Sequence, residues 1–301
     1  MIETGIFVAT FIAVVSSLAP PPPEGYVYVL PQRNLTDIGK RTSFRYNYIT
    51  QSGHCYPYKP SDTSIPISAT NNVIDKALTV SCHTLAKITK NMPREVFVST
   101  SKSEGVGIFT MDETLTVYPQ NSALADRPEC YNRCDGQCRN TCTFDGRKYA
   151  MVPGMTNSIS LSNMESVLCM PRDIYRGTES ILTHEFAHLV HIYMEQKWKD
   201  KIKAAYNNAR SGQLWRMNSY SMANEYEYFA VASESFFHNI IRTDTITTGG
   251  MNLCGGARVC SSERIAREFL RKHDPMVYEV LIYAYTNNRV DIMSNLKACE
   301  K

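Results

Sequence analysis

A pair of histidines four residues apart is the most informative pattern in the chain, because the residue types around it specify a metal-dependent chemistry. The segment His184-Glu185-Phe186-Ala187-His188 reads HEFAH. On an α-helix, residues i and i+4 project from one face, so the two imidazoles can bind one tetrahedral Zn²⁺. Glu185 directly follows the first histidine, where its carboxylate can act as general base toward an attacking water. The pattern therefore predicts a zinc site with hydrolytic chemistry.

The residues around this motif predict the helix that it needs. Residues 178–180, Thr-Glu-Ser, offer a hydroxyl N-cap and an early acid, and no Pro or Gly interrupts the chain from there to about Trp198. Apolar residues recur at helical spacing and leave a separate polar stripe, which consists of His184, His188, His191 and Glu195. Core packing explains such a histidine-rich stripe poorly. We interpret His191 as a packed histidine or a helper of the site, with packing favoured.

A hydrolytic zinc site needs a third protein ligand and an open fourth position. A histidine six residues after His188 is excluded, because a methionine occupies that position. His191 is only three residues on and could not easily turn back to the same ion on a continuous helix. A glutamate from a later helix remains. Residues 224–237 contain no Gly or Pro, their apolar residues recur at helical spacing, and Glu227 and Glu234 fall on one face.

Three segments together resemble a known family. HEFAH is followed by Ser219-Tyr220 and then by NEYEYFA at residues 224–230. This order resembles the metallopeptidase domain of anthrax lethal factor and its gluzincin relatives, from about residue 176 to residue 237. The resemblance implies a zincin-like fold. It also implies that Glu227 is the third zinc ligand and that Tyr220 is a catalytic residue whose hydroxyl stabilises the oxyanion.

The chain departs from the family pattern at one position. The family usually places an acid one turn after the glutamate ligand to support a ligand, and this chain has Val231 there. Glu234, on the same face one turn later, is the candidate substitute. Because such supporting groups orient metal ligands, the departure bears on metal affinity.

The function predicted from these residues is that of a secreted zinc endopeptidase acting on a peptide or protein substrate. His184, His188 and Glu227 would hold one Zn²⁺, and Glu185 would be the general base. Two alternatives stay open: a zinc hydrolase of non-peptide amides or esters, and a secreted non-catalytic zincin-like binding or toxin protein. The second is disfavoured because every HExxH residue is present. The sequence does not identify the substrate.

Composition agrees with an ordinary secreted enzyme. The chain has 301 residues, of which 43% are hydrophobic, and this is ample for one core or two lobes. A net charge of +3 is too mild to indicate a nucleic-acid partner. We therefore expect no nucleic-acid binding, a monomer, and no stable association with a membrane once the leader has been removed.

The first residues predict export. Residues 5–19 form an apolar run of signal-peptide length that is short for a membrane span. We assign residues 1–19 to a signal peptide, with cleavage after Ser16 or Ser17 as a variant. The open alternatives are an internal strand or a retained anchor. Residues 34–36, Asn-Leu-Thr, form a glycosylation sequon.

Ten cysteines follow this leader, and their even number is typical of disulfides in a secreted protein. The densest group is evenly spaced: Cys130, Cys134, Cys138 and Cys142. A second zinc site is the sharper hypothesis for this group, but the spacing is not that of CxxC pairs and secretion favours disulfides. Cys254 and Cys260 are expected to close or flank a glycine-rich loop.

The fold class predicted is α+β and disulfide-stabilised, with a mixed sheet and the HEFAH helix over a helical lower lobe. One peptidase domain spans residues 20–301, with a sheet lobe at about 54–195 and a helical lobe at about 196–301. Hydrophobic periodicity predicts helices at 71–90, 199–208, 224–241, 261–272, 275–285 and 290–299, and strands at 95–99, 105–110, 114–118 and 148–152. In gluzincins an edge strand beside the cleft can pair with an extended peptide, and residues 149–152 are our candidate for it.

Overall fold

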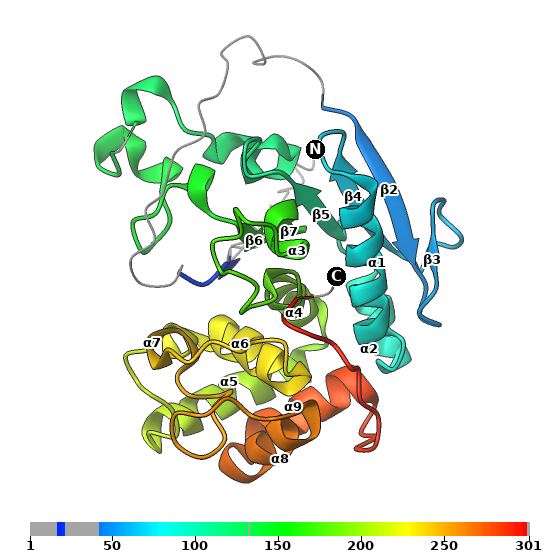
Figure 1. Ribbon diagram of the computed structural model, residues 1–301, viewed down its shortest axis with the longest axis vertical. Helices are drawn as coiled ribbons and strands as arrows, with labels where there is room; N and C mark the ends of the chain where they lie inside the picture. The colour runs from blue at the N-terminus through cyan, green and yellow to red at the C-terminus, as the bar shows by residue number, and fades with distance from the viewer. Residues whose placement is uncertain (1–16, 22–41, 132, 300–301) are drawn as a thin grey trace, which may run out of the picture.

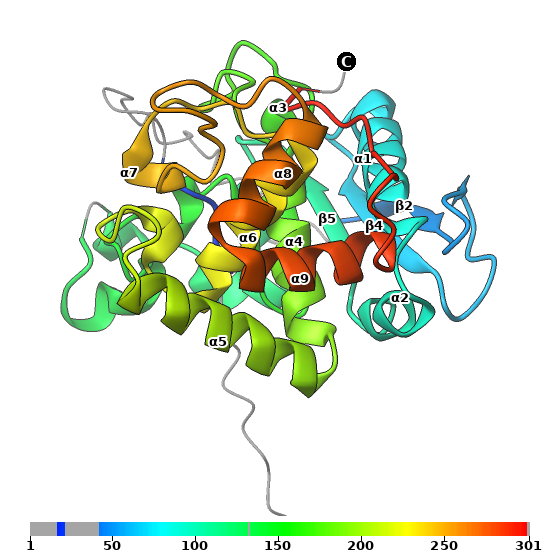
Figure 2. The ribbon, with the colours of Figure 1, turned by 90° about the horizontal axis from the view of Figure 1, so that it is seen from below.

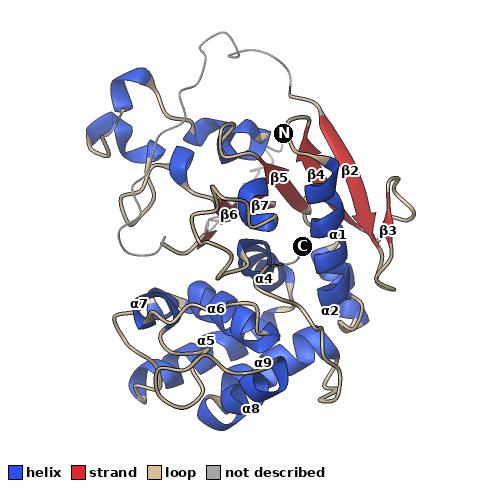
Figure 3. Ribbon diagram, viewed as in Figure 1, coloured by secondary structure: helices blue, strands red, loops and turns tan. Residues whose placement is uncertain are grey.

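The computed structural model describes residues 17–21, 42–131 and 133–299. Figure 1 shows a β-sheet lobe above a lobe made of helices, with α4 between them. Figure 3 shows the same division by element type. Most of the predicted signal peptide, residues 1–16, lies outside the described residues, as does the sequon at residues 34–36.

The described strands form one mixed sheet in the order β1-β6-β7-β5-β4-β2-β3. The central strands β4, β5 and β7 are parallel, whereas β2 and β6 run antiparallel to their neighbours. Strands β1 and β3 are the two edges. The bounds are β1 Ser17–Leu18, β2 Phe44–Ile49, β3 Cys55–Tyr56, β4 Ile65–Thr70, β5 Val106–Phe109, β6 Gly154–Thr156 and β7 Ser160–Asn163.

Helices of the sheet lobe cover the sheet, and the remaining helices form the lower lobe. The upper helices are α1 Asp75–Thr89, α2 Arg94–Thr100, α3 Met164–Val167 and α4 Ile181–Tyr193. The lower helices are α5 Gln196–Ser211, α6 Glu225–Phe237, α7 Thr245–Thr248, α8 Glu263–His273 and α9 Pro275–Thr286. Helix α4 contacts β6 and β7 above and α6 below, and Figure 2, seen from below, shows α5, α6 and α9 on the lower side of the molecule. The HEFAH helix therefore packs against both lobes and connects them.

Burial of apolar side chains explains why the lobes pack as one body. The larger core joins α1, α4, α6 and α9 to one side of the sheet, with fully buried residues such as Leu85, Phe186, Phe229 and Leu281. A smaller core gathers Phe109, Tyr118, Met155, Leu161 and Ile181. Helix α4 contributes to both cores, so its position is fixed from two sides.

The predicted α+β class is confirmed, and so are most of the long helices. Helices predicted at 71–90, 199–208, 224–241, 261–272 and 275–285 correspond to α1, α5, α6, α8 and α9. Pro275 occupies the first turn of α9 as expected. The strand predicted at 105–110 is β5. The sheet lobe begins earlier than the expected limit near residue 54, because β2 belongs to it.

Two of the predicted strands are helical. Residues 95–99 lie in α2, which follows Pro93 and buries Val96, Phe97 and Thr100 along one face. A short run of β-branched residues cannot by itself distinguish a strand from a buried helical turn. Residues 114–118 contain a 3₁₀ helix, Leu115–Val117, and the positive φ of Thr114 (65°) breaks the extended run.

The strand predicted at 148–152 is also wrong, and with it the predicted peptide-binding edge. This segment holds a 3₁₀ helix, Tyr149–Met151. Lys148 before it is buried, and its ammonium donates to Asp126 (2.9 Å) and to Thr141 (2.7 Å), which ties the segment to the cysteine-rich insert. The strand next to the HEFAH helix is instead β6, two residues further along the chain.

The helix predicted at 290–299 does not form, because side chains of α8 satisfy the backbone that a helix would use. The Glu263 carboxylate accepts from the backbone N–H of Ser294 (3.0 Å) and of Asn295 (2.9 Å). Arg267 donates to the carbonyl of Ile292 (2.6 Å). Such local bonds compete with the helical ladder.

All ten cysteines are paired. The disulfides join Cys55 to Cys82, Cys130 to Cys138, Cys134 to Cys142, Cys169 to Cys299 and Cys254 to Cys260. The last pair closes the glycine-rich loop as predicted. Among the described residues, no helix is both long and apolar enough to span a bilayer.

Candidate metal centre

Two N-caps place the candidate ligands. The Ser180 hydroxyl accepts from the backbone N–H of Thr183, which begins α4 at the predicted position. At α6 the Asn224 side chain accepts from the N–H groups of Tyr226 (2.9 Å) and Glu227 (3.0 Å). The cap of α6 therefore also fixes the backbone of Glu227 opposite α4.

Three candidate ligand atoms converge at the contact of α4 and α6. His184 Nε2 lies 3.1 Å from Glu227 Oε2 and 3.1 Å from His188 Nε2. The third edge of the triangle, His188 Nε2 to Glu227 Oε2, is 3.3 Å. The side chains are 0% exposed for both histidines and 1% for the glutamate. The structure thus brings together all three predicted ligands.

The size of this triangle fits a small tetrahedral cation. Ligands about 2.0–2.1 Å from a tetrahedral ion lie about 3.3–3.4 Å from one another. The chemistry of the donors agrees. His184 Nδ1 faces the Glu234 carboxylate at 2.9 Å, so it carries the ring proton in the neutral imidazole and leaves a lone pair on Nε2. That lone pair points at a carboxylate oxygen, and a cation or a proton must lie between them.

The electrostatics of the triangle also favour a cation. Burial raises the pKa of Glu227, but His188 and His184 beside it lower this pKa further, to about 2. Burial lowers the pKa of His184, yet hydrogen bonds to Glu227 and Glu234 bring it well above the usual value. Two carboxylates therefore stabilise positive charge at this buried point.

Glu185 directly follows His184 of the triangle, and only one of its two carboxylate oxygens has a hydrogen-bond partner among the described residues. Its Oε2 accepts from the Thr156 hydroxyl of β6 (2.8 Å). Its Oε1 is buried and has no hydrogen-bond partner among the described residues. Burial raises the pKa of this carboxyl well above its usual range. Gly154 in β6 permits the close approach, since a Cβ there would lie 2.9 Å from Glu185 Cγ.

Further charged side chains surround His184 on the side of its Nδ1 atom. Glu234 contacts His184, as the sequence suggested for a supporting acid. Glu179, fully buried, makes an ion pair with Arg242 (2.6 Å), which also pairs with Asp244 (2.7 Å). Burial and the neighbouring Glu179 raise the pKa of Glu234 to about 8. The candidate ligand His184 thus contacts a network of charged groups that extends to Asp244, the N-cap of α7.

Tyr220 lies near His184, in the 3₁₀ helix Tyr220–Met222. Its ring centre is 6.5 Å from that of His184. Burial raises its pKa well above 10, so the phenol keeps its proton and remains a donor.

His191 does not join the site. Its ring stacks on Tyr226 (4.6 Å between centroids) and meets the edge of Phe229 (5.4 Å). Burial lowers its pKa to about 3, so it stays neutral. The packed interpretation is therefore the one that the contacts support.

Three residues that contact the site were missed in the sequence: Thr156, Glu179 and Arg242. Only Glu179 carried a signal, as an acid before the HEFAH helix. Thr156 sits in a strand that the periodicity did not reveal, and Arg242 is remote in sequence from its partners. No spacing rule connects these positions.

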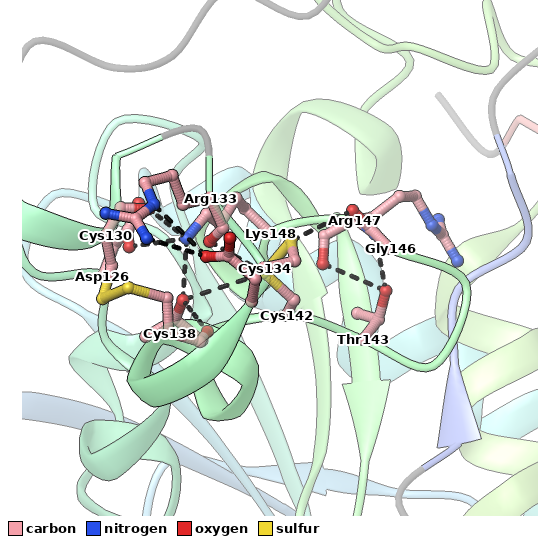
Figure 4. Close-up of a disulfide and its surroundings, with 12 residues drawn as sticks. Asp126, Cys130, Arg133, Cys134, Cys138, Cys142, Thr143, Gly146, Arg147 and Lys148 are labelled. Carbon is pink, nitrogen blue, oxygen red and sulfur yellow. Dashed lines mark hydrogen bonds and ion pairs between the residues drawn. A yellow bond between two sulfur atoms is a disulfide. The ribbon is translucent and has the colours of Figure 1, made fainter.

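The cysteine cluster holds disulfides and no thiolate ligands. Figure 4 shows Cys130 joined to Cys138, with Lys148 reaching back into the insert and Arg147 at its far side. Cys134 pairs with Cys142. The hypothesis of a second zinc site on these four residues is therefore wrong.

Comparisons with known proteins leave the family open. No family model matches the sequence, and no curated protein matches it. Among solved structures, the PRO-PRO endopeptidase from Paenibacillus alvei is similar with a TM-score of 0.43 and 17% sequence identity, over 71% of this chain and 95% of that chain. This degree of likeness assigns neither a family nor an activity, so the site itself must carry the functional argument.

Proposed function

We propose that this chain is a secreted zinc endopeptidase of the gluzincin type. The observation that carries the proposal is the triangle of His184 Nε2, His188 Nε2 and Glu227 Oε2, whose edges are 3.1–3.3 Å, beside a buried carboxylate. The glutamate in this triangle is the one that the resemblance to the lethal factor domain implies. The five disulfides and the predicted leader support export to an oxidising compartment.

The residues divide the chemistry among them. The two histidines and Glu227 would hold Zn²⁺, which polarises a scissile carbonyl and makes water more acidic. Thr156 fixes Oε2 of Glu185, and Oε1 is left to take a proton from the attacking water and return it to the leaving amine. Glu234 orients the His184 ring through Nδ1. Tyr220, which keeps its proton, donates to the developing oxyanion.

The Glu185→Gln substitution tests this assignment in a zinc-loaded protein assayed on a peptide library. Because the amide cannot accept the proton, kcat should fall by about 10²–10⁴-fold, the usual contribution of a general base. Zinc content should remain one ion per chain, since residue 185 is not a ligand.

Glu195→Gln is the matched control, because this glutamate follows the same helix and is exposed. It should leave hydrolysis unchanged. Undiminished, chelator-sensitive peptide hydrolysis by Glu185→Gln would overturn the base assignment. Hydrolysis by the unaltered protein that persists after chelation and removal of zinc would overturn the zinc mechanism.

A further inference from the structure

A short segment near the N-terminus lies along the edge of β6. Residues 17 and 18 pair antiparallel with Thr156 and Met155, and the backbone N–H of Ala19 donates to the carbonyl of Gly154 (3.0 Å). Ala19 is fully buried in the smaller core. The segment thus adds an edge strand to the sheet. Without it, the outer side of β6 would have no neighbouring strand.

Three side chains hold the continuation of this segment, and all of them bind its backbone carbonyls. Arg147 donates to the carbonyls of Ala19 (3.0 Å) and Pro20 (3.3 Å), and the Tyr175 hydroxyl donates to that of Pro20 (2.7 Å). Arg242 donates to the carbonyl of Pro21 (3.1 Å). Proline has no N–H, so carbonyls are its only backbone hydrogen-bonding groups.

These side chains bind the backbone of residues 19–21 and not its side chains. Figure 4 shows Arg147 directed away from the cysteine-rich insert toward this part of the molecule. An extended peptide of a different sequence offers the same carbonyls and the same N–H as residues 19–21. The outer edge of β6 and the side chains of Arg147, Tyr175 and Arg242 are together called the receptor edge here. Their hydrogen bonds suit the backbone of any extended peptide.

The receptor edge adjoins the candidate catalytic residues. Thr156 donates to both the backbone carbonyl (2.9 Å) and the carboxylate of Glu185, and Gly154 lies against the side chain of the same glutamate. The segment pairs with these same β6 residues. Arg242, which holds Pro21, also pairs with Glu179 behind the metal triangle. Glu185 itself is 0% exposed, so a substrate has no access to it in this form.

We propose that residues 17–21 are an intramolecular blocking segment that occupies the edge of β6 where an extended peptide substrate would add. This inference rests on the proposed peptidase function and states how it is regulated. The position of N-terminal processing then decides activity. A cut after Ala19 removes β1, whereas a cut after Ser16 leaves it in place, and both positions fall within the expected limits of the leader.

The test uses the complete 301-residue chain. A recognition site for a sequence-specific protease is inserted after residue 23, the folded zinc-loaded protein is cut, and the released fragment is removed and its loss checked by mass. The kcat/KM for peptide hydrolysis should rise at least about tenfold. A synthetic peptide with the sequence of residues 16–23 should then raise KM and leave kcat unchanged. No rise after complete removal of the fragment overturns the proposal.

The matched control inserts the same recognition site after Gly255, in an exposed loop that the Cys254–Cys260 disulfide spans. Cutting there should leave kcat/KM unchanged. A variant that needs no cutting is Ala19→Glu, which places a charge where the side chain is fully buried and so should displace the segment. It should raise kcat/KM of the intact chain, and an unchanged or lower value speaks against blocking.

Binding measurements separate this proposal from the proposed function. A fluorescent peptide of residues 16–23 should bind the cut Glu185→Gln protein, and Arg147→Ala in that protein should weaken binding about tenfold. Binding without hydrolysis by the unaltered cut protein refutes the peptidase, and with it the blocking role, and leaves the edge of β6 only as a binding site for extended peptide. Hydrolysis without binding of this peptide refutes the blocking segment alone.

Discussion

Two buried clusters of titratable side chains share His184 in this molecule, and only one of them contacts an arginine as its own cation. His184, His188 and Glu227 present three donor atoms to one point. Glu179, His184 and Glu234 also bring three donor atoms within 4.8 Å of one another. The second cluster has its own cation, because Arg242 lies 2.6 Å from Glu179.

The difference separates a cluster whose charges are balanced within the protein from one that could bind an ion. A guanidinium is permanently charged and bound to its chain, so the second cluster can neutralise buried carboxylate at all times. The first cluster contains no permanently charged cation among its three members, so a proton on a histidine or an exchangeable ion must balance the carboxylate. Metal removal should therefore change the cluster of His184, His188 and Glu227. Substitution of Glu179, the partner of Arg242, should change the other cluster.

The largest effect should follow Glu227→Ala, which removes a ligand from the first cluster. Zinc affinity should fall by more than about 100-fold, since even the loss of a group that supports a ligand costs 10- to 100-fold. Competition with a chromogenic chelator measures this. Glu225→Ala, two residues earlier and partly exposed, is the control and should bind zinc normally. Zinc binding by Glu227→Ala within a few-fold of the unaltered protein would contradict the ligand assignment.

A smaller effect should follow Glu234→Gln, which changes the member of the second cluster that contacts the shared His184. The amide oxygen can still accept from His184 Nδ1, but the negative charge behind the ring is lost, so zinc affinity should fall about tenfold. The same competition assay measures it, with the exposed Glu268→Gln on α8 as control. A variant with unaltered affinity would mean that this contact only packs the two helices.

The smallest effect on zinc should follow Glu179→Gln, although it should cost stability. Removing one partner of a buried ion pair typically destabilises by about 3–5 kcal/mol. Asp244 still pairs with Arg242, which places the expected loss in the free energy of unfolding at the low end, about 3 kcal/mol. Zinc affinity should change only a few-fold.

Urea unfolding of the zinc-free protein with its disulfides intact measures this loss. The double variant Glu179→Gln/Arg242→Met should recover part of it, because it leaves no unpaired buried arginine. A loss below about 1 kcal/mol in the single variant would show that Arg242 does not balance Glu179.

The sequence predicts the three residues that converge and the acid Glu234 beside them, but not the contacts of Glu179, Arg242 and Thr156. The two histidines follow from spacing within one helix, and periodicity places Glu227 and Glu234 on one face of a second helix. Only the resemblance to the lethal factor domain selects Glu227 as the third ligand. The pairing of Glu179 with Arg242 and of Thr156 with Glu185 spans 63 and 29 residues. Such contacts are set by how elements pack, which local patterns do not record.

The same limit explains the errors in the sheet lobe. Residues 95–99 have strand composition, yet they pack as a helix because one face meets the core. The sequence predicts the edge strand beside the cleft at 149–152, but the buried ammonium of Lys148 binds Asp126 and the carbonyl of Cys130 and so holds that segment against the cysteine-rich insert. In both places tertiary contacts outweigh local propensity.

X-ray absorption at the zinc edge of the purified full-length protein tests the convergence of the three side chains most directly. We predict one zinc per chain, coordinated by two imidazole nitrogens and further oxygen ligands at about 2.0–2.2 Å, with no sulfur. The His188→Ala variant should contain much less zinc, and the imidazole contribution to the spectrum should fall with it. Sulfur at about 2.3 Å, or zinc retained without histidine coordination, would contradict the account.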